Sequence, residues 1–282
     1  MNYQTSVRPS PIAGTWYPGN TAQLRKTIEG YLENAAPPAL PGEVVALVAP
    51  HAGYRYSGHV AAHAFKTVQS RGFTKVLVIS PMHQYHPQPI LTSAHQAYRT
   101  PLGDIPLDRE KLKGIDSMLQ EQTGLSLTPV ANDLEHSLEI ELPFLQVALS
   151  EDFTLIPIML RDQTRKIAKA LGEILGETLN GEDCLMVASS DLSHFYTENQ
   201  ANQLDERVLS ALSKFSPNGL FDLNQRGEGQ ACGLAAMAAV LWASQKMGAD
   251  RATLLKYDTS ASATGDRSSV VGYAAAAITR PN

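Results

Sequence analysis

Two histidines in this 282-residue chain each follow a short apolar segment that runs into a proline. His51 comes after residues 44–48, and His83 comes after residues 75–80. The apolar runs predict buried strands, and proline ends a strand because it has no N–H to donate. Imidazole nitrogen suits iron, copper, zinc or nickel. A single loop histidine would indicate a surface hydrogen bond, but the repeated pattern predicts a shared metal or catalytic site.

A third apolar segment, residues 184–190, is followed by Asp191 and His194. A histidine of ordinary pKa exchanges a proton near neutral pH, so His194 is a candidate acid or base. Asp191 would orient it or bind the metal itself; the alternative is that Asp191 only caps the following turn. Cys232 lies near the start of an alanine-rich helix, where the helix dipole favours a thiolate. By position alone, a buried and inert cysteine is the better interpretation.

His136 and Glu139 are three residues apart in a segment from residue 133 that predicts a helix, with a kink or break at Pro143. At that spacing the two side chains would share a helix face, as in di-iron carboxylate helices. Bundle di-metal sites use two such pairs and this chain has one. We therefore expect His136 and Glu139 to form the pocket wall or to support the ligands from behind.

The elements that position these residues alternate between strand and helix. A helix is predicted after Gly58, between the first two strands, which makes a βαβ unit with two adjacent parallel strands. The carboxyl ends of such strands form the edge where ligands bind. Residues 153–160 also predict a strand, with Pro157 indicating a bulge or an edge position.

The whole chain, residues 1–282, is predicted to be one α/β domain with a central, mostly parallel or mixed sheet flanked by helices. Residues 1–42 would form an N-terminal arm and helix packed on this body, closed by a proline-rich linker.

The composition excludes several classes of protein. A net charge of −5 and the lack of a Lys/Arg run give no reason to expect nucleic acid or a membrane surface as a partner. No signal-peptide pattern or membrane-length apolar run is present, and the two cysteines are too few for a disulfide framework. We expect a cytoplasmic protein. Nucleotide-binding glycine motifs and the hydrolase nucleophile elbow are also missing.

The candidate residues stand in a series of short motifs, in the order Pro50-His-Ala-Gly-Tyr54, Tyr56-Ser-Gly58, Ser80-Pro-x-His83, Glu135-His-Ser-x-Glu139, Ser189-Ser-Asp-x-Ser-His194 and Ala231-Cys-Gly233. In this combination the chain resembles the Memo family, known in prokaryotes as the AmmeMemoRadiSam system protein B. The resemblance covers nearly the whole chain. It implies the fold of the class III extradiol dioxygenases, which open catechol rings with non-haem Fe(II).

Carried onto this chain, the resemblance implies that the metal ligands are His51, His83 and Cys232. It also places His194 where the dioxygenases keep an acid/base histidine. Trp16 and Tyr54 match aromatic residues that line the pocket of the family. The cysteine departs from the 2-His-1-carboxylate triad of the dioxygenases, and a thiolate favours copper or thiolate-bound iron. Ring cleavage therefore does not follow from the shared fold.

Three functions remain open at this point. The first is redox chemistry on an unidentified small substrate, with iron or copper as the cofactor. The second is a non-catalytic metal- or peptide-binding protein that acts as a partner in a radical-SAM system. The third and weakest is a zinc-dependent hydrolase, in which Asp191 or His194 would activate water.

Overall fold

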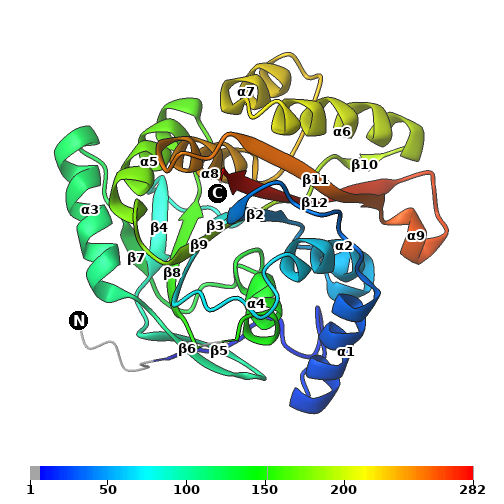
Figure 1. The fold of residues 1–282 in the computed structure, drawn as a ribbon, viewed down its shortest axis with the longest axis horizontal. Helices are drawn as coiled ribbons and strands as arrows, with labels where there is room; N and C mark the ends of the chain where they lie inside the picture. Colours follow the sequence, from blue (N-terminus) through cyan, green and yellow to red (C-terminus); the bar gives the residue numbers. More distant parts are fainter. Residues whose placement is uncertain (1–6, 151, 282) are drawn as a thin grey trace.

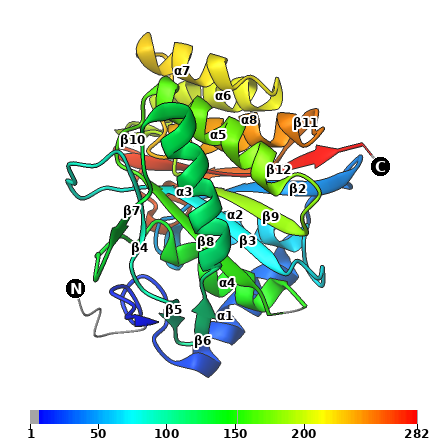
Figure 2. The same ribbon diagram turned by 90° about the vertical axis from the view of Figure 1, so that its left-hand side faces the viewer.

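The computed structural model describes residues 7–150 and 152–281, and arranges them as a mixed β-sheet between two layers of helices (Figures 1 and 2). The strands of this sheet are β2 (Glu43–Ala49), β3 (Lys75–Pro81), β4 (Ile90–Ser93), β7 (Thr128–Val130), β8 (Thr154–Leu160), β9 (Cys184–Ser189), β10 (His194–Tyr196), β11 (Arg251–Thr259) and β12 (Val270–Arg280). Their order is β10-β12-β2-β9-β3-β8-β4-β7, and β11 also pairs with β12. The predicted α/β class with a mixed sheet is confirmed.

The centre of the sheet is parallel, because β2, β9, β3 and β8 all run in the same direction. β12 is antiparallel to β2 and closes the sheet on that side. The prediction that β2 and β3 are adjacent is wrong, because β9 comes in from later in the chain and pairs with both of them. The carboxyl ends of all three strands still meet at one edge.

Helices cover both faces of the sheet. One face is covered by α1 (Thr21–Asn34), α2 (Tyr54–Lys66), the short 3-10 helix η1 (Glu139–Glu141) and α4 (Leu142–Ala148). The other carries α3 (Arg109–Thr123), α5 (Arg165–Leu179), α6 (Glu198–Ser213), α7 (Pro217–Gln225) and α8 (Leu234–Lys246). Figure 2 shows α5 and α8 directly over the sheet, with α6 and α7 outside them. A short helix, α9 (Ala261–Thr264), precedes β12.

The core is divided by the sheet into two halves. Leu77 of β3 packs with α5 and α8, whereas Val78, the next residue, packs with α1 and α2. This follows from the strand geometry, which points successive side chains to opposite faces. Fully buried apolar residues on both faces explain why the central strands read as continuous apolar runs.

A second, three-stranded sheet ties the start of the described chain to the body. It consists of β1 (Val7–Arg8), β5 (Ala97–Thr100) and β6 (Gly103–Pro106). β1 pairs parallel to β5, which forms a hairpin with β6. Residues 1–6 of the predicted arm lie outside the described residues. Among the residues that are described, no helix combines the length and apolar character needed to cross a bilayer.

Three local predictions were wrong. α2 begins at Tyr54, ahead of Gly58, because Gly53 O accepts the first helical hydrogen bonds. The helix expected from residue 133 begins only at Leu142, so Pro143 lies in its first turn, where no N–H is needed, and does not kink it.

Pro157 lies in β8, inside the sheet, and its pairing with β3 shows no bulge. On its other side β8 pairs with β4 only beyond the proline, and Thr92 Oγ1 donates to Pro157 O at 2.7 Å. The missing N–H is therefore tolerated at an interior position.

Candidate metal centre

The site lies at the carboxyl edge of the parallel strands. His51 follows β2, Asp191 follows β9 and His83 follows β3. The register places Ala49 beside Ser189, so the ends of β2 and β9 are level. In open α/β sheets this edge is the usual place for a ligand. The prediction that these strand ends converge is confirmed by the strand pairing.

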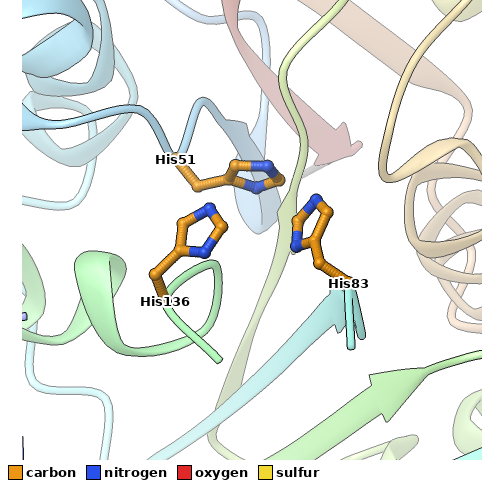
Figure 3. Close-up of side chains that lie close together, drawn as sticks. All are labelled: His51, His83 and His136. Carbon is orange, nitrogen blue, oxygen red and sulfur yellow. The ribbon is translucent and has the colours of Figure 1, made fainter. Parts of the chain in front are cut away.

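Three imidazole rings meet at this edge, from His51, His83 and His136. The ligand nitrogens that they offer all lie within 4.8 Å of one another. Figure 3 shows the rings turned toward a common space, with His136 coming from the segment before η1 and α4. His83 and His136 are stacked, with centroids 4.8 Å apart, and the His51 ring stands nearly perpendicular to both. His136, expected in the wall of the pocket, is therefore a third candidate ligand.

His51 is the buried member of the cluster, with 2% of its surface exposed. Its Nδ1 lies 2.9 Å from Ser189 Oγ, and its main-chain N–H donates to Asp191 Oδ1 at 2.7 Å. Its Nε2 lies 3.0 Å from Cys232 Sγ. Burial holds the pKa of His51 well below its ordinary value, and positive charge on His136 and His83 would lower it further. His51 is therefore a neutral imidazole near pH 7.

Glu135 holds His83 from behind. Its carboxylate lies 2.9 Å from His83 Nδ1 and accepts the main-chain N–H of His83 at 2.6 Å. It also accepts the N–H groups of His136 and Ser137. Burial alone would raise the pKa of Glu135, but these hydrogen bonds outweigh it and hold the pKa far below normal. The bond to the Glu135 carboxylate raises the pKa of His83, more than burial lowers it, and leaves Nε2 to face the site.

Trp16 covers His136, with ring centroids 4.2 Å apart. Burial lowers the pKa of His136 to about 4, and positive charge on His83 adds to the effect. His136 is thus neutral at physiological pH, with its lone pair available to a metal. Trp16 lies where the prediction of a pocket aromatic placed it, although that role stays a prediction.

Cys232 reaches His51 because the chain around it packs very closely on β9. A Cβ at Gly233 would lie 2.2 Å from Ser189 O, so only glycine fits there. Gln163, which follows β8, donates to Cys232 O at 2.6 Å and fixes the loop. Burial raises the pKa of the Cys232 thiol well above normal, and the charge of Asp191 raises it further. Without a bound cation, Cys232 is a neutral thiol.

Asp191 and His194 do not act on each other as expected. Asp191 is turned to His51, and its Oδ2 lies 4.0 Å from His51 Nε2. Burial raises the pKa of Asp191 to about 7, although N–H groups of His51 and Ala52 oppose the shift. His194 Nδ1 instead lies 2.8 Å from Leu192 O, which accepts its proton and leaves Nε2 free. Burial lowers the pKa of His194, so it is a neutral base near pH 7.

A bulge in β10 aims His194. Phe195, the next residue, has φ of 65° and the register of β10 against β12 shifts there. A bulge bends the strand and redirects the neighbouring side chain, and such features cluster beside functional sites.

Tyr54 and Glu139 make their hydrogen bonds with groups other than the three clustered histidines, and their predicted roles at the pocket stay predictions. Tyr54 is 3% exposed and donates to Ile140 O. Glu139 accepts hydrogen bonds from Ser10 and Tyr17 and forms a buried ion pair with Arg8. The spacing of His136 and Glu139 therefore does not put them on one helix face, because the chain between them is irregular.

The donor set fits a transition-metal ion. Ligands at about 2.0–2.1 Å in a tetrahedral arrangement are about 3.3 Å apart, so the cluster closes on an ion with small ring movements. Histidine ligands in proteins donate their second N–H to a carboxylate or another acceptor, which fixes the ring. Here Ser189 and Glu135 stand at those positions for His51 and His83.

No role was predicted from the sequence for Arg8, Gln163 or Ser189. Glu135 and Glu141 were also not among the predicted site residues. Glu135 precedes His136 in a recognised motif, so a signal for it existed. Arg8 stands in a loop-like segment with no pattern, and Gln163 follows a strand without any distinguishing neighbour.

The family model described as "Memo-like protein" matches residues 8–277. A "MEMO1 family protein" of Methanosarcina acetivorans is 36% identical over 95% of this chain and 98% of its own length. Proteins of the same description from Methanosarcina mazei and Methanopyrus kandleri are each 34% identical, over 95% and 97% of this chain and 98% and 99% of theirs.

Proposed function

This chain belongs to the Memo family, and we propose that it binds one transition-metal ion, iron or copper, for redox chemistry on a small substrate. The observation that carries the proposal is the meeting of three imidazoles at one sheet edge, with a thiol 3.0 Å from one of them. A nitrogen and sulfur donor set suits copper, iron and zinc, and does not suit magnesium or calcium.

Four residues would hold the ion. His51, His83 and Cys232 are the ligands that the family resemblance implies, and the geometry adds His136. A bound iron or copper ion would supply one-electron redox chemistry at this edge of the sheet. Ser189 and Glu135 accept hydrogen bonds from the two rings and so orient them, and binding needs little reorganisation of the protein.

The remaining side chains bind and move protons. His194 is neutral and keeps Nε2 free, so it can take a proton from a substrate hydroxyl. Asp191 has a pKa of about 7 and can hold a proton close to His51. Trp16 covers His136 and limits the access of water to that side of the cluster.

Titration with Co²⁺ under anaerobic conditions tests the ligand set. We expect visible d–d bands and a sulfur-to-cobalt charge-transfer band in the wild-type protein. Cys232→Ser should lose the charge-transfer band, and His136→Gln should weaken binding. His63→Gln is the matched control, because His63 lies in α2 and its Nδ1 contacts His59 O. Failure of the wild-type protein to bind Co²⁺, or an unchanged spectrum in Cys232→Ser, would contradict the proposed site.

The metal that co-purifies without oxygen separates the functions. Iron or copper, together with oxygen consumption on a panel of phenols and catechols, supports redox chemistry. Tight binding of either metal with no turnover would instead favour the binding-protein alternative. Zinc alone would favour hydrolysis.

A further inference from the structure

Glu141 is a buried carboxyl group behind the metal centre with no direct contact to the candidate ligands. It lies in η1 with 1% of its surface exposed. Its side-chain partner is Ser189, the last residue of β9, whose Oγ is 2.7 Å from Glu141 Oε1. Ser189 in turn contacts His51 Nδ1 at 2.9 Å. A single hydroxyl therefore connects Glu141 to the His51 ring.

The hydrogen bonds of Ser189 have only one consistent assignment. Its Oγ has three partners, namely His51 Nδ1, Glu141 Oε1 and the main-chain O of Ser137, the last at 2.6 Å. A hydroxyl has one proton to donate and two lone pairs to accept with. Ser137 O is a carbonyl and can only accept, so the proton of Ser189 goes to it. The two lone pairs must then be met by donors on Glu141 and His51.

We propose that Glu141 is a positioning residue that, as a neutral carboxylic acid, donates to Ser189 Oγ and so holds His51 with its proton on Nδ1. The lone pair of His51 Nε2 then faces the site. This deepens the proposed function and rests on it in one respect, since Nε2 is the atom that would bind the metal.

The opposite assignment leaves unfavourable contacts. If Glu141 were ionised, it would take the Ser189 proton, and Ser189 Oγ and Ser137 O would face each other at 2.6 Å without a proton between them. The carboxylate would also be buried with one hydrogen bond, which is costly. In agreement, burial raises the pKa of Glu141 well above normal, and the charge of Asp191 raises it further.

The contacts of Cys232, on the other side of the His51 ring, are consistent with a proton on His51 Nδ1. With Nδ1 protonated, His51 Nε2 is an acceptor, and the neutral Cys232 thiol 3.0 Å away can donate to it. The Asp191 N–H points to the same sulfur at 3.2 Å, so the thiol both accepts and donates. Each of the contacts Glu141–Ser189, Ser189–His51 and His51–Cys232 then joins a donor to an acceptor.

Three variants separate this role from a merely structural one. Glu141→Gln keeps a donor, because the amide N–H can replace the carboxyl O–H. Glu141→Met has similar length and no donor, and Ser189→Ala removes the connecting hydroxyl. In metal-free protein, long-range proton–nitrogen NMR of His51 reports the tautomer directly. We expect the Nδ1-protonated form in the wild type and in Glu141→Gln, and a mixture of tautomers in the other two.

Infrared spectra give a second readout, the protonation state of Glu141, which a purely structural role would not predict. The wild type should show the C=O stretch of a buried protonated Glu141, which Glu141→Gln and Glu141→Met should both lose in difference spectra; any band from Asp191, whose pKa is about 7, should remain in both variants. An Nε2-protonated His51 in the wild type, or an ionised Glu141, would overturn the proposal even if metal binding were intact.

Metal affinity is measured by titration with Co²⁺ in the presence of a competing chelator. Glu141→Met and Ser189→Ala should weaken affinity by about 10–100-fold, which is typical for residues that orient a ligand. Glu141→Gln should stay near the wild type, and Glu141→Met should add nothing once Ser189 is alanine. A loss in Glu141→Gln as large as in Glu141→Met would overturn the proposal. The predicted tautomer in a wild-type protein that binds no Co²⁺ would instead contradict the proposed function alone.

Discussion

Arg8 lies near the start of the described chain, yet we expect its replacement to lower the stability of the protein strongly. It is fully buried and forms two hydrogen bonds with the Asp133 carboxylate, at 2.8 and 3.0 Å, and one with Glu139 at 2.5 Å. It also donates to Glu135 O and lies over the Tyr98 ring. These partners flank His136 on both sides in sequence. The arm therefore holds the segment that carries a candidate ligand.

Arg8→Met would leave two buried carboxylates without their cation. Breaking a buried ion pair by removing one partner costs about 3–5 kcal/mol, and with two carboxylates affected we expect about 5 kcal/mol. The whole free energy of unfolding of a protein is roughly 5–15 kcal/mol. The variant should thus be marginally stable at neutral pH, with a clearly lower midpoint in urea.

The loss should depend on pH. Burial raises the pKa of Glu139 above normal even though Arg8 opposes the shift, so the pKa must rise further in the variant. The unfolded chain releases this proton near pH 4.3, whereas the folded variant keeps it to higher pH. The folded state then binds more protons than the unfolded state, and stability falls as pH rises through that window. The variant should be closer to wild type at pH 5 than at pH 8.

Urea unfolding followed by circular dichroism at the two pH values measures this. Arg99→Met is the control, because Arg99 forms an exposed pair with Asp104 and its loss should matter little. Arg8→Met combined with Glu139→Gln should recover part of the loss. A loss below about 1 kcal/mol at pH 8, or the same loss at both pH values, would refute the reasoning about buried charge.

Four further outcomes follow from the site. Glu135→Gln should weaken Co²⁺ binding by about 10–100-fold in chelator competition, because the carboxylate orients His83; an unchanged affinity would exclude that role. Affinity should fall as the pH is lowered through the raised pKa of His83, because the proton competes with the metal, and a flat profile between pH 8 and 5 would count against His83 as a ligand. Gly233→Ala should cost at least about 1–3 kcal/mol in urea unfolding and disturb the cobalt–thiolate band, since its Cβ would meet Ser189 O. Phe195→Gly should leave stability unchanged or raise it by up to about 1 kcal/mol, because the left-handed backbone costs an ordinary residue about 1–2 kcal/mol and glycine returns part of that as entropy. A clear loss of stability would show that the Phe195 backbone is not strained.

The strand ends of the site were predictable because the signal is local. A buried strand, a proline and a histidine are neighbours in sequence, and the parallel arrangement of strands brings His51 and His83 to one edge. The order of the strands was not predictable in the same way. β9 lies between β2 and β3, and nothing in the sequence of the first hundred residues predicts that a strand from much later in the chain inserts there.

The misplacement of His136 has a definite physical cause. The apolar spacing after residue 133 indicates a helix, but main-chain groups of that segment form hydrogen bonds with buried side chains instead. Glu135 accepts the main-chain N–H groups of His136 and Ser137 within that segment and that of His83 outside it, and Arg8 donates to the carbonyl of Glu135. Main-chain groups bonded in this way do not form helical turns. Such tertiary contacts are invisible to a periodicity argument.

The contact of Ser189 with Glu141 was equally out of reach, because it depends on how η1 packs against the end of β9. Either residue alone reads as an ordinary serine in a strand end or an ordinary glutamate in a helix. The link from Glu141 to His51 can be inferred only because three oxygen and nitrogen partners surround the Ser189 hydroxyl in the structure.

The pairing of β12 with β2 has a consequence for the synthesis of this protein. β2 carries the first candidate ligand just beyond its end, yet its neighbour β12 lies at the far end of the described chain. A pairing between such distant segments closes a large loop and slows folding. During translation the edge of β2 must wait, unpaired, while almost all later residues emerge, and in that time it is open to wrong pairing with other chains.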